Sequence, residues 1–160
     1  MRYMPKPVTV AIDVPRSVDE VFEYLDVMAN HEPFNDHLMR DWELSGPDRG
    51  IGSKARVHVR ALGIRDVIDI EVMDAERPVR IVERNTAAKA GRVGQGTYTL
   101  RPNADGGTHI EFEYRWLVAP LLDRLTAPFV RSYLRRNNTT SMRRLAELLT
   151  TQRGTAMRNS

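Results

Sequence analysis

The sequence predicts an α+β domain in which a curved antiparallel sheet of about seven strands wraps around a long C-terminal helix. Two observations lead to this prediction. Between residues 38 and 116, six successive segments alternate apolar with polar side chains, and short turns separate them. Strands joined by such short turns must run largely antiparallel. Residues 126–152 then read as one amphipathic helix, which is long enough to cover the middle of that sheet.

The composition limits the classes of function. The 160 residues, 41% hydrophobic and 28% charged, suit one domain with a hydrophobic core. The absence of cysteine excludes disulfides, cysteine-ligated metals and a thiol nucleophile. A net charge of +3 without interleaved aromatic residues predicts no nucleic-acid partner. No apolar run approaches the roughly 20 residues of a membrane span. No signal-peptide core follows the N-terminus, so we expect a cytoplasmic protein that is not an integral membrane protein.

The first elements are a strand and a capped helix. Residues 8–14 alternate apolar with polar or small side chains, which is the period of a half-buried strand. Ser17 and Glu20 have the spacing of a capping box, and the helix that they begin fades near Asn30. Residues 31–37 contain proline and asparagine, so we expect a short second helical turn or a loop there.

The six further strands are separated by turn signals. In the fourth of them the pattern does not decide which residues face inward, because Ile81 and Val82 both fit the inward position. In the fifth, Gly94 and Gly96 share a face with Tyr98, which suggests strong bending or the close approach of another element. The expected strands cover residues 38–44, 55–61, 66–72, 79–87, 92–101 and 110–116.

The C-terminal helix carries an apolar stripe that turns polar in its middle. Its members are Leu134, Asn137, Ser141, Leu145 and Leu148, extended toward the N-terminus by Val130 and Tyr133. A helix packed flush on a core would usually carry leucine or alanine at the middle positions, so this stripe favours a helix that lids a cavity. Thr126 is the expected N-cap. The sequence does not decide whether the segment forms one kinked helix or two helices. We expect one domain over residues 1–153 and a frayed tail over residues 154–160.

Several short segments resemble a known superfamily over nearly the whole chain. They are residues 12–15 (IDVP), 17–25 (SVDEVFEYL), 50–52 (GIG), 82–85 (VERN), 96–100 (GTYTL) and 107–108 (GT). With this order of elements, they resemble the helix-grip superfamily (SRPBCC) that includes START domains and the birch-pollen-allergen fold. The chain is most similar to its polyketide cyclase/dehydrase and lipid transport-like proteins of actinobacterial type. The resemblance implies a helix-grip fold whose members bind lipids, sterols, polyketides or plant hormones. Some members catalyse cyclisation, whereas others only carry or sense their ligand. The superfamily has no catalytic motif that all members share.

Side chains with inward parity form the predicted ligand-binding set. The hypothesis is that they line a partly open apolar cavity with a few polar anchors; the alternative is that they fill a solid core. The set comprises Trp42, Val57, Val59, Asp66, Ile68, Ile70, Tyr98, Phe112, Tyr114, Trp116, Tyr133, Asn137 and Ser141. Asn137 and Ser141 would bind a ligand head group, or else bond to protein groups or water.

Asp66 is a weak candidate for a catalytic acid or base, and the catalytic residue is otherwise unknown. It shares the parity of the inward isoleucines, and burial would raise its pKa. The alternative places it at the open rim, paired with an arginine such as Arg40. Glu83 has the same ambiguity. His31 and His37 do not have zinc-site spacing, so we predict a solvated loop around them, no metal and no cofactor.

Three functions follow as hypotheses. The first is binding or carriage of a hydrophobic small molecule, such as a lipid or a polyketide-like compound, in an internal cavity between the sheet and the C-terminal helix. The second is a cyclase/dehydrase-type enzyme that uses the same cavity, and the third is an interaction module without a ligand. Oligomeric state is open between monomer and homodimer. A basic outer helix surface is either solvated or makes transient contact with an anionic membrane or acidic partner; it comprises Arg131, Arg135, Arg136, Arg143 and Arg144.

Overall fold

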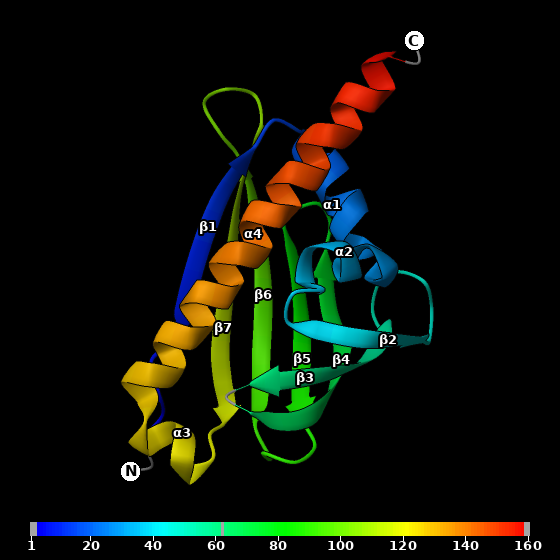
Figure 1. The fold of residues 1–160 in the computed structure, drawn as a ribbon. Coiled ribbons are helices and arrows are strands. Elements are labelled where there is room, and N and C mark those ends of the chain that lie inside the picture. Colours follow the sequence, from blue (N-terminus) through cyan, green and yellow to red (C-terminus); the bar gives the residue numbers. More distant parts are fainter. Residues whose placement is uncertain (1–2, 62, 159–160) are drawn as a thin grey trace.

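The predicted architecture is confirmed in a computed structural model, which describes residues 3–61 and 63–158 (Figure 1). One seven-stranded antiparallel sheet has the strand order β1-β7-β6-β5-β4-β3-β2. Each strand from β2 to β6 pairs with the next one along the chain, because short turns join them. Its strands are β1 (Val8–Val14), β2 (Met39–Ser45), β3 (Lys54–Ala61), β4 (Ile64–Glu76), β5 (Arg80–Ala87), β6 (Val93–Pro102) and β7 (Thr108–Val118).

Helices cover one face of this sheet. The N-terminal group comprises α1 (Val18–Asp26), the 3-10 turn η1 (Met28–His31) and α2 (Glu32–Asn35), and the C-terminal group comprises α3 (Leu121–Leu125) and α4 (Ala127–Arg158). Figure 1 shows α4 lying diagonally across the sheet, with α1 and α2 beside it. The fully buried Leu145 and the buried Leu149 belong to the same core as Val8 and Ile110 of the sheet. Among the described residues, no helix combines the length and hydropathy needed to cross a membrane.

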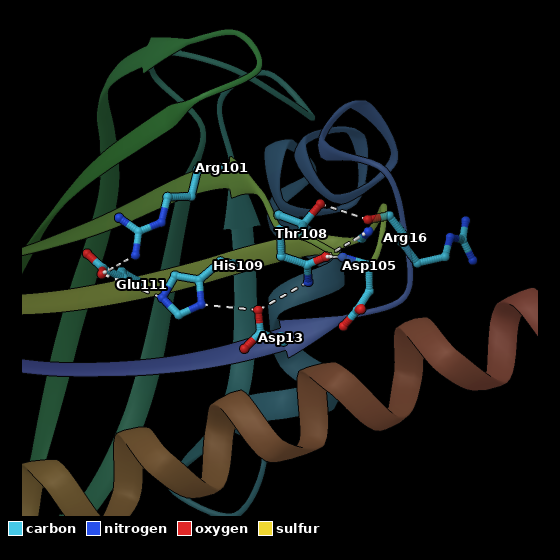
Figure 2. Close-up of polar contacts among 9 residues, drawn as sticks. Asp13, Arg16, Arg101, Asp105, Thr108, His109 and Glu111 are labelled. Carbon is cyan, nitrogen blue, oxygen red and sulfur yellow. Dashed lines mark hydrogen bonds and ion pairs between the residues drawn. The ribbon is translucent and has the colours of Figure 1, made fainter.

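The first strand is held in the sheet by the β6–β7 hairpin (Figure 2). β1 pairs antiparallel with β7, with Val14 opposite Thr108. The Thr108 hydroxyl donates a hydrogen bond of 2.7 Å to the Arg16 carbonyl, just beyond β1. In the turn, the Asn103 side-chain oxygen accepts from the amide of Gly107 at 2.9 Å. These bonds close the hairpin and fix the strand that precedes α1.

The C-terminal segment forms two helices, and Thr126 lies between them, directly before α4, at the position expected for its N-cap. Its hydroxyl donates to the Leu122 carbonyl of α3 at 2.7 Å, and no bond from an α4 amide to this hydroxyl is present among the described residues. Its carbonyl does accept from the amides of Phe129 and Val130 at the start of α4. α4 then continues to Arg158, into the segment expected to be a frayed tail, and residues 159–160 of that segment lie outside the described residues.

The buried face of α4 is rotated slightly from the predicted stripe. Ser141 and Leu145 are buried as expected, but Met142 and Leu149 are buried with them. Asn137 and Leu148 are half-buried at the margin of this face. Steps of three and four fit a turn of 3.6 residues in more than one phase, so the pattern alone did not select the correct one.

A bulge in β2 breaks the predicted alternation of residues 38–44. The pairing of β2 with β3 shifts register between Arg40 and Glu43, and Asp41 has a φ of 54°. Because an extra residue lies between them, Met39 and Trp42 both pack against the core, although their parities differ. Leu44, expected to face the same side as Trp42, is 52% exposed.

Two glycines of β6 lie directly beneath aromatic rings of β7, as their shared face suggested. Gly94 pairs with Trp116 and Gly96 with Tyr114 in the β6–β7 register. A Cβ atom on Gly94 would lie 2.2 Å from the Tyr114 hydroxyl oxygen, and one on Gly96 would lie 3.0 Å from the Phe112 ring. The missing side chains therefore allow these two rings to lie against the backbone of β6.

We predict that Gly94→Ala destabilises the protein by about 1–3 kcal/mol, because the added methyl group collides with the Tyr114 ring. Urea unfolding of the wild type, both single variants and the double variant with Tyr114→Ala forms a double-mutant cycle. Gly94→Ala should cost much less when Tyr114 is already truncated. Equal costs in both backgrounds would contradict this explanation of the glycine.

Candidate functional site

A pocket lies between the inner face of the sheet and the middle of α4. Its volume is about 130 Å³, and its lining is mainly aliphatic and aromatic. The apolar floor includes Ile70 and Phe112 from the sheet, and Leu134 and Met142 lie on the helical side. Polar lining residues come from several elements: His31, Asn35, Glu83, Asn85, Arg92, Asn138 and Ser141. The arrangement is that of a small apolar cavity with a few polar groups facing it.

Nine of the thirteen residues predicted to bind a ligand line this pocket, and their part in binding stays a prediction. They are Trp42, Val59, Ile68, Ile70, Tyr98, Phe112, Tyr114, Tyr133 and Ser141. Val57, Asp66, Trp116 and Asn137 are not among its lining residues. Val57 is fully buried in the core. The Asn137 amide group donates to the Tyr133 carbonyl of its own helix at 2.9 Å, and its neighbour Asn138 lines the pocket.

Asp66 holds a turn together and is not placed to act as an acid or base in the pocket. Its carboxylate accepts from the amides of Val67 and Lys89, both at 2.7 Å, and of Ala90 at 2.9 Å. Partial burial alone would raise the pKa of Asp66, but these three amide donors outweigh it and keep the pKa below its usual value. The rim position was one of the two expectations, but its partners are backbone amides and not Arg40.

The Trp116 side chain bonds to a buried ion pair at the end of the sheet. Its indole Nε1 donates to Asp123 of α3 at 2.9 Å. Arg92 donates to the other oxygen of the same carboxylate at 2.6 Å, and Asp123 is 2% exposed. Burial by itself would raise the pKa of Asp123, but the donors Arg92 and Trp116 outweigh it and lower the pKa. This cluster ties α3 to the sheet; the sequence signal for it was a single acidic residue in an apolar turn.

His31 is buried, so the prediction of a solvated loop around it is wrong. Its ring is 3% exposed and lies 5.4 Å from the Phe34 ring and 5.8 Å from the Tyr98 ring. The chain folds back after α1, which places His31 Nε2 2.7 Å from the Leu25 carbonyl. A carbonyl can only accept, so Nε2 carries the proton and Nδ1 is an acceptor. Burial lowers the pKa of His31, which favours this neutral form.

The histidines do not gather a metal site. His37 Nε2 lies 3.3 Å from the Asn137 carbonyl, 100 residues along the chain. Within residues 3–61 and 63–158, no group of three or more histidine, aspartate, glutamate or cysteine side chains has the arrangement of a metal site.

Ser141, another predicted polar anchor, donates to Asn35 of α2 at 2.8 Å.

Glu83 is the acidic residue that faces the pocket. The structure settles the open parity of β5, because Ile81, Glu83 and Ala87 are all buried on the inner face. Glu83 is 5% exposed, and its Oε2 lies 4.0 Å from His31 Nδ1, too far for a hydrogen bond. Burial raises the pKa of Glu83 to about 7. A carboxyl group whose pKa is raised by burial therefore borders the cavity, whereas the sequence alone left its orientation undecided.

Two arginines of the basic surface predicted on the last helix bond to other segments of the same chain. Arg131 donates to the carbonyls of Lys6 and Pro7, at 3.0 and 3.1 Å. Arg144 forms an ion pair with Asp36 after α2. These two side chains fasten α4 to neighbouring segments.

We predict that Asp123→Ala lowers the free energy of unfolding by roughly 2–3 kcal/mol, since Arg92 and the Trp116 indole would lose their partner. Asp69→Ala is the matched control, because it removes an ion pair with Arg56 in which both side chains are more than half exposed. That change should cost less than about 1 kcal/mol. Similar losses for the two variants in urea unfolding would contradict a structural role for the cluster.

A second prediction concerns the pH dependence of stability. The pKa of Glu83 is raised from 4.5 to about 7 in the folded protein, so the folded state binds more protons between these values and stability falls as the pH rises through them. The stability of the wild type relative to Glu83→Gln should therefore drop by roughly 3 kcal/mol between about pH 4 and about pH 8. His31 and Tyr98, which face Glu83, are present in both proteins.

Urea unfolding across this pH range checks the prediction, with Glu76→Gln as the control, since Glu76 is 64% exposed. The difference for the control should stay flat. A flat difference for Glu83→Gln as well would show that Glu83 titrates normally.

Solved structures with the same fold include proteins of low sequence identity. The protein TTHA0849 from Thermus thermophilus matches 92% of this chain and 99% of its own at 16% identity, with a TM-score of 0.69. Ara h 8.0201 matches 88% of this chain and 98% of its own at 12% identity, with a TM-score of 0.57. DynU16, from the dynemicin biosynthetic locus, is 25% identical over 91% of this chain, with a TM-score of 0.64. The match covers 48% of DynU16, so this chain spans about half of that protein.

A comparison with curated proteins gave no match. The family model described as polyketide cyclase / dehydrase and lipid transport matches residues 6–150. That match covers most of the chain and agrees with the helix-grip fold described above. The chain belongs to the polyketide cyclase/dehydrase and lipid transport family.

Proposed function

We propose that this protein binds and carries a hydrophobic small molecule in the pocket between the sheet and α4. Family membership supports a role in hydrophobic-ligand binding or in cyclase-type chemistry. The observation that carries the proposal is the pocket itself, an apolar cavity of about 130 Å³ inside the core of a small domain. Native cores are close-packed, so a cavity of this size beneath a helix needs an explanation.

The volume sets the size of the ligand group that fits. A cavity of about 150 Å³ holds benzene in an engineered protein, whereas pockets for drug-sized ligands measure roughly 300–1,000 Å³. The pocket therefore accommodates one ring or a segment of a longer chain, and a larger ligand requires α4 or α2 to move outward. Burying roughly 150 Å² of ring surface contributes about 4 kcal/mol before the costs of binding are subtracted. The dissociation constant of a single ring is therefore about 1 mM or higher.

A cyclase/dehydrase-type enzyme is the second candidate, and Glu83 is the observation that favours it. A general base works best when its pKa lies near the operating pH, and that of Glu83 is about 7. Its carboxyl group borders the cavity, where it would meet an acidic C–H or O–H group of a bound chain. In this version of the function Glu83 takes the role that the sequence had suggested for Asp66.

We predict that p-xylene, an apolar single-ring molecule, binds the wild-type protein weakly, with a dissociation constant of a few millimolar, on the order of 1 mM or somewhat above. Ala87→Leu should abolish binding, because Ala87 lines the pocket and is 4% exposed, so a leucine there fills the space. Ala104→Leu is the control, as it adds the same atoms to the exposed β6–β7 turn. Saturation-transfer NMR provides the measurement. Absence of binding to the wild type, or unchanged binding to Ala87→Leu, would overturn the proposal.

A further inference from the structure

Three of the residues that line the pocket carry a buried polar atom without a hydrogen-bond partner. Among the described residues, five buried side-chain atoms lack a partner, and three of them belong to pocket-lining residues. These three are Glu83 Oε2, Asn85 Oδ1 and Asn138 Nδ2. An unpaired buried polar atom costs about 1–3 kcal/mol, so such atoms are rare and seldom gather in one place.

The three residues come from opposite walls of the pocket. Glu83 and Asn85 are two positions apart on β5, so their side chains share the inner face of the sheet. Asn138 belongs to α4, which covers that face. With Glu83 ionised, the floor therefore offers two acceptors, and the roof offers one donor. The remainder of the lining is mainly apolar, so a ligand that satisfies these atoms must be apolar elsewhere.

We propose that the ligand of this pocket is an apolar molecule with a hydroxyl group, which donates to Glu83 or Asn85 and accepts from Asn138. A hydroxyl group both donates and accepts, so one group can satisfy atoms on both walls. It also reaches the buried site at a smaller desolvation cost than an ammonium group would. This inference rests on the proposed function, that the pocket holds a hydrophobic small molecule, and it names the chemical class of that molecule.

The bonding state of the neighbouring polar residues supports this assignment. The Ser141 hydroxyl is already bonded to Asn35, and His31 Nε2 to the Leu25 carbonyl. Arg92 is held by Asp123. Among the described lining residues, Glu83, Asn85 and Asn138 are those with a fully buried polar atom that lacks a hydrogen-bond partner.

The test compares p-cresol with p-xylene, which have the same shape but differ in one hydroxyl group. For each protein the measured quantity is the affinity for p-cresol divided by the affinity for p-xylene, which cancels the difference in their hydrophobicity. We expect this ratio to fall at least fivefold in Glu83→Leu and in Asn138→Leu. It should change less than twofold in Thr139→Leu, the matched control at an exposed position of α4.

The outcomes separate this inference from the proposed function. If p-xylene binds but the ratio is unchanged in Glu83→Leu and Asn138→Leu, the hydroxyl assignment is overturned and the apolar pocket stands. If neither compound binds the wild type, both fail. A measurement on the wild type covers the case in which a variant does not fold. The ¹³C resonance of the Glu83 carboxyl group should shift on saturation with p-cresol and not with p-xylene, and equal shifts would contradict the assignment.

Discussion

The close approach of two aromatic rings to the backbone of β6 shapes the inner surface of this protein. Tyr114 and Phe112 occupy the positions that side chains at Gly94 and Gly96 would take. Because the rings lie against the backbone, they need not extend to α4, and space is left between the sheet and the helix. Glu83 pairs with Gly96 across β5 and β6. The absence of a side chain at Gly96 therefore also leaves room beside the Glu83 side chain.

The helix above this space is fixed on both sides of the pocket. Toward the C-terminus, Leu145 and Leu149 are buried in the core shared with β1. Toward the N-terminus, α3 is tied to the sheet by Asp123, which bonds to Trp116 and Arg92. The stretch between them covers the pocket and carries the polar Asn138 and Ser141. A helix held in this way can bridge a cavity without collapsing into it.

The sequence predicted the elements well wherever the backbone is regular. Alternation in β3, β6 and β7 identified their inner faces, and the glycine pair of β6 indicated a close approach. It failed where the backbone departs from regularity, as at the bulge beside Asp41, which brings Met39 and Trp42 to the same side. It could not decide the position of a side chain that bonds to backbone groups of a distant segment.

Asp66 and His31 are such cases, and both concern the site. Asp66 has inward parity, but the amides of Lys89 and Ala90 capture its carboxylate, and no local pattern announces that contact. His31 lies just after α1, and its ring bonds to the Leu25 carbonyl at the end of that helix. The ring is therefore buried, although the segment around it is rich in turn residues. Apolar lining residues were therefore predictable from periodicity, whereas the polar residues of the pocket needed the tertiary structure.

The central claim is that an apolar hollow persists between the sheet and α4. A crystal of the protein pressurised with xenon tests it most directly, because xenon enters dry apolar cavities and is located by its anomalous scattering. The account predicts a xenon atom beneath α4, in contact with Ile70, Phe112 and Leu134. No xenon at that position, with side chains packed solidly between the sheet and α4, would contradict it.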